Sequence, residues 1–364
     1  MDEPPSNGPN GRTEPDADRS MPTDRPVATV VIPARNEEAW IGACLDSIVS
    51  QDERRLQILV VDGASTDRTP EIVKEYSARD GRVTLLSNPD RIIPRSLNIA
   101  LREASAPWLV RVDAHASIPS DYVGRAVDHL RSGRWGGVGG RKDGVGVTPA
   151  GRAIAAAMAS PFGVGNSTYH YGSEATTVEH IPFGAYPVDL ARRLGGWDER
   201  LRVNQDFEFD YRVRLAGGEL LFDPDLRIQW FCRQSVPELF RQYRRYGEGK
   251  VSVAVLHPLS LRLRHLAAPA LVFSWAVSAL LARRHPAWAA TLVAPYAGAL
   301  AVATQRTART LADPQDRKWV APAFAAMHTG WGVGFWRGVA RVARSRARGL
   351  RQSPGSDADV KTSA

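Results

Sequence analysis

Polar and acidic side chains follow three short apolar runs of the sequence. Pro33 to Glu37 come after the first run, Asp62 to Asp67 after the second, and Asp113 to His115 after a later one. Carboxylates and an imidazole gathered in this way can bind a polar or charged ligand. Neither GxGxxG nor GxxxxGK[ST] occurs in the sequence, so dinucleotide-binding and P-loop sites lose their main support.

The apolar runs themselves are predicted to be buried strands. They cover residues 28–33, 57–62, 83–87 and 107–113. Amphipathic helical stretches alternate with them, and Thr69-Pro70 marks a helix start, with a capping residue before a proline. This alternation predicts an α/β fold with a mostly parallel sheet flanked by helices. Ligands of such sheets bind beyond the carboxyl ends of the strands, where the polar segments stand.

Other features of this body are simpler. The glycine-rich stretch from 136 to 147 is predicted to be a mobile loop, and Asp189 to Arg214 resume helical character around an acidic cluster. The only two cysteines, Cys44 and Cys232, are far apart and predicted to be buried reduced thiols, which fits a reducing cytosolic environment.

The C-terminal third differs sharply from this body in charge and hydropathy. Residues 241–351 hold 18 Lys and Arg against three acids, so the remainder of the +8 chain carries −7. Such asymmetry indicates a polyanionic partner, either nucleic acid or an anionic membrane surface. Two 18-residue runs without charged residues, 265–282 and 287–304, favour the membrane and predict hydrophobic helices. A basic nucleic-acid-binding protein remains the alternative.

Five segments in order resemble signatures of the family 2 glycosyltransferases. They are VVIPARNEE, VVDGASTDRT, VRVDAHA, GGWDERLRVNQDFEFDYRVRLAGG and QYRRY, and HTGWGVGFWRG adds a likeness to the branch that builds succinoglycan-type exopolysaccharides. The resemblance implies a GT-A nucleotide-sugar-binding fold, which is Rossmann-like. It also implies inverting transfer of a sugar from a nucleoside diphosphate to an acceptor hydroxyl.

The resemblance assigns donor binding to the strand ends. It implies that Asp62 binds the uracil or ribose, with Gly63 permitting the turn after it, while Arg111 assists the phosphates or pairs with an acid. The residues that would frame the nucleotide are Pro33, Ala34, Arg35 and Glu37. Asp67 is equally well explained as a cap of the helix that starts at Thr69.

The metal site follows from the same resemblance. Asp113 and His115 stand where the family has Asp-x-Asp, and they imply a divalent metal, Mn²⁺ or Mg²⁺, that neutralises the leaving diphosphate. Histidine in the second position favours Mn²⁺. A histidine that leaves the metal to Asp113 alone is the simpler reading.

The remaining roles concern the acceptor. Asp206 stands at the position of the general base, with Gln205 in place of the usual preceding acid and Glu208 and Asp210 as neighbouring carboxylates. The resemblance places a diphosphate and acceptor region at the residues Gly184, Gln242, Arg245 and Tyr246. A basic helix lying on lipid headgroups is the other reading of the segment from 242 to 246.

These inferences combine into one expected enzyme. It has a disordered tail (1–26), a GT-A-like catalytic domain (27–250), a basic membrane-associated helical region (251–350) and a second disordered tail (351–364). It is expected at the cell membrane with the catalytic domain cytoplasmic. Its partners are a nucleotide-sugar donor such as UDP-glucose, a lipid-linked or other saccharide acceptor and membrane lipids, with no nucleic acid. A catalytically inactive nucleotide-sugar-binding relative is a further alternative, because Gln205 and His115 depart from the pattern.

Overall fold

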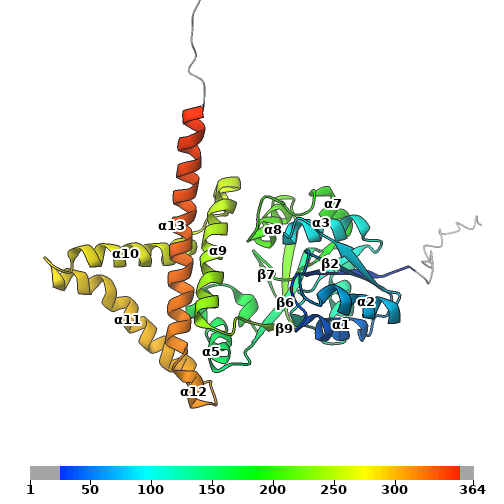
Figure 1. Ribbon diagram of the computed structural model, residues 1–364, viewed down its shortest axis with the longest axis horizontal. Helices are drawn as coiled ribbons and strands as arrows, with labels where there is room; N and C mark the ends of the chain where they lie inside the picture. The colour runs from blue at the N-terminus through cyan, green and yellow to red at the C-terminus, as the bar shows by residue number, and fades with distance from the viewer. Residues whose placement is uncertain (1–24, 353–364) are drawn as a thin grey trace, which may run out of the picture.

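The structure is a computed structural model that describes residues 25–352 (Figure 1). An α/β body holds the first two thirds of the chain, and long helices form the remainder. The two predicted tails, 1–26 and 351–364, fall almost wholly outside the described residues. The division into a catalytic domain to residue 250 and a membrane-associated region beyond it stays a prediction.

The first half of the sheet is parallel, as predicted. It contains β1 (Ala28–Ala34), β2 (Leu56–Asp62), β3 (Val83–Ser87) and β4 (Trp108–Arg111). β1 lies between β2 and β4, and Ala34 pairs with Asp62 at its carboxyl end. The helices between these strands are α1 (Ile41–Val49), α2 (Thr69–Arg79) and α3 (Ile93–Glu103). The first polar segments therefore lie at one edge of the sheet.

The second half adds antiparallel strands, so the sheet is mixed and not purely parallel, while most of its paired residues are parallel, as predicted. The strand order is β3-β2-β1-β4-β8-β6-β9-β5, and β7 pairs with β9. β8 is antiparallel to both β4 and β6, whereas β6 and β9 are parallel to each other. These strands are β5 (Ala116–Ser117), β6 (Trp135–Val145), β7 (Thr176–Val178), β8 (Ala185–Pro187) and β9 (Glu219–Phe231).

The glycine-rich stretch is strand β6, so the prediction of a mobile loop was wrong. Its glycines admit neighbours that any side chain would exclude. A Cβ on Gly140 would stand 1.7 Å from the carbonyl oxygen of Leu226, and one on Gly139 would stand 2.5 Å from Ile181. Glycine runs resemble loops in a sequence, but here close packing requires them.

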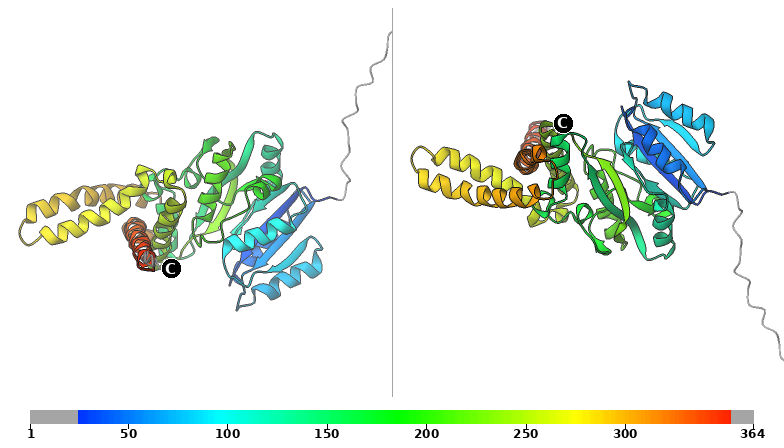
Figure 2. Two further views of the ribbon diagram at one scale, coloured as in Figure 1. Left: turned by 90° about the horizontal axis from the view of Figure 1, so that it is seen from above. Right: turned by 90° about the horizontal axis from the view of Figure 1, so that it is seen from below.

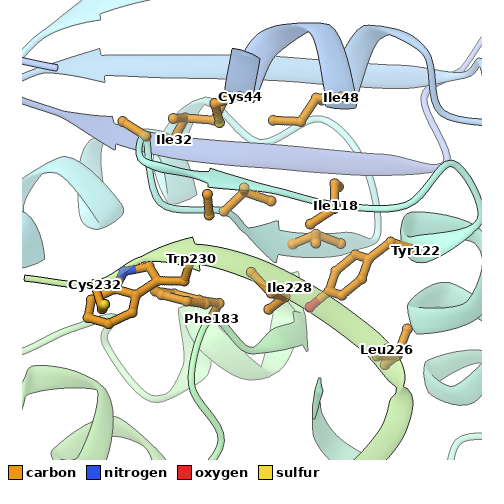
Figure 3. Close-up of a cluster of buried hydrophobic side chains, with 14 of the residues drawn as sticks. Ile32, Cys44, Ile48, Ile118, Tyr122, Phe183, Leu226, Ile228, Trp230 and Cys232 are labelled. Carbon is orange, nitrogen blue, oxygen red and sulfur yellow. The ribbon is translucent and has the colours of Figure 1, made fainter. Parts of the chain in front are cut away.

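The core lies on both faces of the sheet. Val30 and Ile32 of β1 enter one buried cluster, and Val31 between them enters the other. Figure 3 shows part of the first, including Cys44 and Cys232. Both thiols are buried and free, as predicted, and burial raises the pKa of Cys232 to about 11. The covering helices include α4 (Tyr122–Arg131), α7 (Val188–Arg193) and α8 (Gln205–Leu215).

Two long helices pack closely at the border of the body. α9 (Val236–Leu256) and α13 (Val320–Gln352) run side by side in the same direction (Figure 1). Glycines at every fourth position of α13 permit the contact, because a Cβ on Gly334 would lie 2.0 Å from the carbonyl oxygen of Arg244. The HTGWGVGFWRG segment is thus a packing surface. Two shorter helices also pack against α13, α5 (Pro149–Met158) and α6 (Pro161–Val164), whereas η1 (Thr168–His170) packs against β6.

The two apolar runs form a projecting helical pair. The chain passes through η2 (Pro258–Ser260) and η3 (Leu263–Leu266) into α10 (Ala267–Leu281) and α11 (Pro286–Ala308), and then into α12 (Pro314–Arg317). Figure 2 shows α10 and α11 extending away from the body. The helical segment Leu263–Leu281, which is η3 continued by α10, and α11 are each long and apolar enough to cross a membrane. α10 and α11 each bury only two side chains. This pair, residues 267–308, is called the hairpin below; it does not form a buried cap on the body.

Candidate active site

The ends of β1 and β2 are joined by hydrogen bonds between their following loops. Asn36, in a left-handed conformation with φ of 56°, donates its amide to Ser65 Oγ at 2.9 Å, and its Oδ1 accepts from the amide of Thr66 at 2.8 Å. Ala64 is also left-handed, with φ of 54°, whereas Gly63 is not. The expectation that Gly63 permits the turn was therefore wrong, because Ala64 and not Gly63 has the left-handed conformation.

Asp62 and Asp67 have different surroundings in this edge. Asp62 accepts from the amide of Ser65 at 3.2 Å and from its hydroxyl, so the carboxylate is held at the strand end. Asp67 accepts from the amide and hydroxyl of Thr69 at 3.0 and 2.6 Å, next to the start of α2. Burial by itself raises the pKa of Asp67. These hydrogen bonds and one from the Glu38 amide outweigh burial, so the pKa lies below its ordinary value. The geometry favours the capping interpretation of Asp67.

Arg111 connects two carboxylates that are distant in sequence. It is the last residue of β4, its side chain is 5% exposed, and its Nε donates to Asp113 Oδ1 at 3.0 Å. Its Nη1 donates to Oδ1 of Asp206, in the first turn of α8. Burial lowers the pKa of Arg111, but the charges of Asp113 and Asp206 outweigh it and raise the pKa. The guanidinium is therefore a permanent cation that holds the two carboxylates together.

The three carboxylates of α8 have different surroundings. Glu208 is buried and pairs with Arg212 at 2.7 Å and His257 at 2.9 Å. Asp210 is fully buried and accepts from Tyr186 Oη at 2.7 Å and the Ile181 amide at 2.9 Å. Burial raises the pKa of Asp210 despite these bonds. The side chain of Asp206 is 24% exposed, so of the three it is the one open to a ligand.

Helix α9 forms the other side of the site. Asn204 precedes α8 with a left-handed φ of 62°, and its side-chain Nδ2 donates to the carbonyl of Tyr246 at 3.0 Å. Gln242 donates to Tyr246 Oη at 3.0 Å, and its own Oε1 is buried without a partner in the described part of the chain. Burial, with nearby charges that include Asp113, raises the pKa of Tyr246 to about 12. Arg245, in contrast, points to solvent.

His115 lies near Asp113 and is oriented by a third residue. Its Nδ1 is 3.1 Å from Glu37 Oε1, and its ring lies 5.8 Å from that of Trp230. A carboxylate that engages one ring nitrogen is the usual way to orient a metal-ligating histidine through the other. Within residues 25–352, no three His, Cys, Asp or Glu side chains converge on one ion position. These residues therefore do not form a complete metal site by themselves, and metal ligation by Asp113 and His115 stays a prediction.

Lys142 is a cation of this site that sequence reasoning missed. Its Nζ lies 3.4 Å from the ring centroid of Trp230 and 4.9 Å from that of Phe183, whose ring also lies 5.6 Å from the guanidinium of Arg111. Burial lowers its pKa to about 8, although the charge of Asp113 opposes this. No carboxylate of the described chain forms a salt bridge with it. Its place in β6 was hidden by the interpretation of that stretch as a loop.

The remaining predicted residues have plainer positions. Gly184 is buried and its carbonyl accepts from the Arg111 amide at 3.3 Å; a Cβ there would lie 2.4 Å from Tyr186 Oη. Pro33 and Ala34 end β1, and Arg35 beyond them is exposed. Gly184 thus supports the strand that carries Arg111. Pro33, Ala34 and Arg35 lie at the same edge of the sheet as Asp62.

Comparisons with known proteins identify the family of this chain. The model of glycosyl transferase family 2 matches residues 29–189. The succinoglycan biosynthesis protein ExoA of Rhizobium meliloti (strain 1021) is 32% identical over 314 residues, covering 85% of this chain and 93% of that protein. The glycosyltransferase AglE of Haloferax volcanii is 26% identical over 66% of this chain and 79% of its own length.

A solved structure shares the fold. The mannosyltransferase PcManGT from Pyrobaculum calidifontis, in complex with GDP-Man and Mn²⁺, aligns with a TM-score of 0.56 at 24% identity over 87% of this chain and 88% of that one. Its likeness extends beyond the matched family segment into the helical region. The chain belongs to glycosyltransferase family 2 and is a transferase with the nucleotide-sugar-binding GT-A fold, related to polysaccharide biosynthesis proteins.

Proposed function

We infer that this enzyme transfers a sugar, with inversion, from a nucleotide-sugar donor such as UDP-glucose to a lipid-linked saccharide. The product belongs to exopolysaccharide or cell-envelope glycan synthesis, as the likeness to a succinoglycan biosynthesis protein suggests. The observation that carries the proposal is the bridge from Asp113 through Arg111 to Asp206. It sets one open carboxylate beside the place where the diphosphate would lie.

The donor lies along the strand ends in this proposal. Asp62 accepts hydrogen bonds from the nucleoside, and Pro33, Ala34, Arg35 and Glu37 frame it. Asp113 and His115 would hold a divalent ion, Mn²⁺ or Mg²⁺, with Glu37 orienting the imidazole. Such an ion, when bound, neutralises charge that develops on the leaving diphosphate. PcManGT, which shares the fold, binds GDP-Man and Mn²⁺.

Asp206 serves as the general base. Arg111 donates to Oδ1. Among residues 25–352, Oδ2 accepts only a long hydrogen bond, 3.4 Å, from the side-chain Nε2 of Gln205, so Oδ2 is available to accept the proton of the acceptor hydroxyl. Removal of that proton lets the hydroxyl oxygen attack the anomeric carbon opposite the diphosphate. A single displacement of this kind inverts the anomeric centre. Lys142 adds a positive charge near the departing phosphates.

The acceptor side is formed by α9 and the segment before β8. Gln242 has a buried oxygen without a partner among the described residues, and Tyr246 is partly buried. Gln242 bonds Tyr246, whose carbonyl accepts from Asn204, two residues before Asp206. Gly184 supports the strand that carries Arg111, through the hydrogen bond from the Arg111 amide to its carbonyl. Arg245 is exposed and would contact the acceptor or the headgroups rather than the buried phosphates.

The hairpin attaches the enzyme to the cell membrane, with the catalytic domain cytoplasmic. The candidate spans Leu263–Leu281 and Pro286–Ala308 have 19 and 23 residues, about 28 and 34 Å of helix, which is close to the roughly 30 Å hydrocarbon core. The tip between them carries Arg283 and Arg284, which would lie in the hydrocarbon if the hairpin entered the bilayer and would have to pass through it if the hairpin crossed. The arginines therefore favour helices that lie at the interface, where these side chains reach the headgroups.

Release of nucleoside diphosphate from a panel of nucleotide sugars tests the proposal. Membranes containing the full chain are compared with and without EDTA and with and without lipid-linked saccharide. We expect release that requires the metal and rises with the acceptor. A chain that binds nucleotide sugars but never turns them over would instead be the catalytically inactive relative.

A further inference from the structure

Four cationic side chains surround one carboxylate where the body meets the hairpin. Arg262 Nη2 lies 3.2 Å from Glu179 Oε1, and Arg264 pairs with Oε2 of the same residue. Lys250 of α9 and Arg214 of α8 are near enough for their charges to affect this group, since Arg214 helps to lower the pKa of Glu179 and the pKa of Lys250. These five residues are called the neck cluster.

Lys250 is buried in this cluster without a salt bridge among the described residues, although the charge of Glu179 acts on it. It is 2% exposed, and its Nζ donates to the carbonyl of Ser260 at 3.1 Å. The same atom lies 3.5 Å from the ring centroid of Phe207, and no carboxylate of the described chain forms a salt bridge with it. Burial lowers its pKa to about 7. An ammonium has three protons to donate, and here one acceptor and one aromatic face meet them.

Two further polar atoms of the neighbourhood lack partners. Ser260 Oγ and Arg214 Nε are both buried and make no hydrogen bond in the described part of the chain. Native proteins satisfy nearly all buried polar groups, so each exception requires an explanation. Donors left without acceptors, together with four cations against one carboxylate, indicate a missing ligand with several anionic oxygens.

The position of the cluster identifies the kind of ligand. On one side, Phe207 lies under Lys250 and directly follows the proposed base Asp206. On the other side, Arg262 and Arg264 precede the hairpin and alternate with apolar side chains. Leu259 and Leu263 are 81% and 87% exposed. Apolar side chains that extend outward between arginines suit the surface of a bilayer, where phosphate groups lie beside hydrocarbon.

We propose that the neck cluster binds the phosphate group of the lipid that carries the acceptor saccharide. This assignment rests on the proposed function, because it takes the acceptor to be lipid-linked. The lipid chain lies along the hairpin, the phosphates meet Lys250, Arg262 and Arg264, and the saccharide extends past Phe207 to Asp206. The excess cationic charge matches the two or three negative charges of a diphosphate.

The first test is direct binding and requires no turnover. The full chain in detergent micelles, with EDTA present so that the metal-assisted donor site does not bind a diphosphate, is titrated with farnesyl diphosphate, and farnesol serves as the phosphate-free probe. Lys250→Met and Arg264→Gln should each weaken farnesyl diphosphate binding about 10-fold, the loss of one charge-assisted hydrogen bond. Arg283→Gln, at the tip of the hairpin, is the matched control and should bind as the wild type does.

Each other outcome overturns the assignment. Equal weakening by Arg283→Gln would mean general attraction to a basic surface, and unchanged binding by Arg264→Gln would remove the cluster from the site. Competition by an equal concentration of phosphatidylglycerol would make the site one for bulk lipid. Because Asp206→Asn should bind farnesyl diphosphate normally while losing transfer, failure of the proposed reaction and failure of this site are distinguishable.

Discussion

The two charged clusters of this molecule have opposite imbalances. At the sheet edge, the buried Arg111 bridges Asp113 and Asp206, so carboxylates exceed cations in that bridge. In the neck cluster, four cations surround Glu179. The first arrangement suits a metal ion and a base that accepts a proton, whereas the second suits a phosphate. Comparing them separates the chemical step from the capture of the lipid.

The largest effect is expected from the acidic edge. Asp113→Ala removes a proposed metal ligand and one partner of Arg111, so turnover should fall by orders of magnitude and chelation should abolish it in the wild type. The measurement is diphosphate release with EDTA, then with Mn²⁺ or Mg²⁺ restored, and Mn²⁺ should restore more. Full activity in EDTA would contradict the metal assignment. His115→Ala tests the second ligand separately.

The next effect concerns the base. Asp206→Asn preserves shape and removes basicity, so kcat should drop on the order of 10²-fold or more with donor binding nearly intact. Steady-state kinetics and donor titration measure the two. Asp128→Asn is a fitting control, because that side chain is 72% exposed on α4. Glu208→Gln would be a poor control, since Glu208 is buried against Arg212 and His257. An Asp206→Asn variant with ordinary kcat would exclude it as the base.

A third effect separates attachment from catalysis. Replacing residues 267–308 by a short flexible linker keeps α13 against α9 but removes the hairpin. We expect the variant to leave the membrane fraction and to lose about 10-fold or more of its activity on a lipid-linked acceptor, while diphosphate release to water persists. Pelleting and the two assays measure this.

The intact chain should also stay with membranes in high salt, because apolar burial survives screening. Release by salt alone would restrict the attachment to charge. The double variant Arg283→Gln, Arg284→Gln is the control, since it changes the tip and keeps both apolar helices.

The acidic edge could be predicted from the sequence, and the neck cluster could not. Parallel strands alternating with helices bring their ends together, so Pro33, Asp62 and Asp113 were predicted at one edge from local patterns. The bridge to Asp206 was beyond such patterns because α8 follows much later in the chain. The antiparallel strands of the sheet were not predicted, because β8 and β5 are very short and carry little strand signal.

The prediction for the glycine-rich strand β6 was wrong for a related reason. Glycine weakens a strand pattern, and only the neighbours Ile181 and Leu226 show why it is needed. Lys142 was missed with it. The residues of the neck cluster come from four separate segments, and their excess charge becomes visible only when Arg214, Lys250 and Arg264 are placed beside Glu179.

The smallest effect is a pH dependence of lipid binding. Burial lowers the pKa of Lys250 from its ordinary value to about 7, and the phosphate requires the protonated form. As pH rises from 6 to 8, Lys250 loses its proton, so farnesyl diphosphate binding should weaken and level off at a total loss of about 10-fold, the loss expected of Lys250→Met. Other charged or titratable groups also face this site, namely Glu179, Arg214, Arg262, Arg264 and His265. The ligand titrates as well.

The measured quantity is therefore the difference in farnesyl diphosphate binding between wild type and Lys250→Met across the pH range, because this difference cancels contributions common to both. Lys74→Met, an exposed lysine of α2, should retain the wild-type profile. A profile that Lys250→Met leaves unchanged would assign the pH dependence to another group.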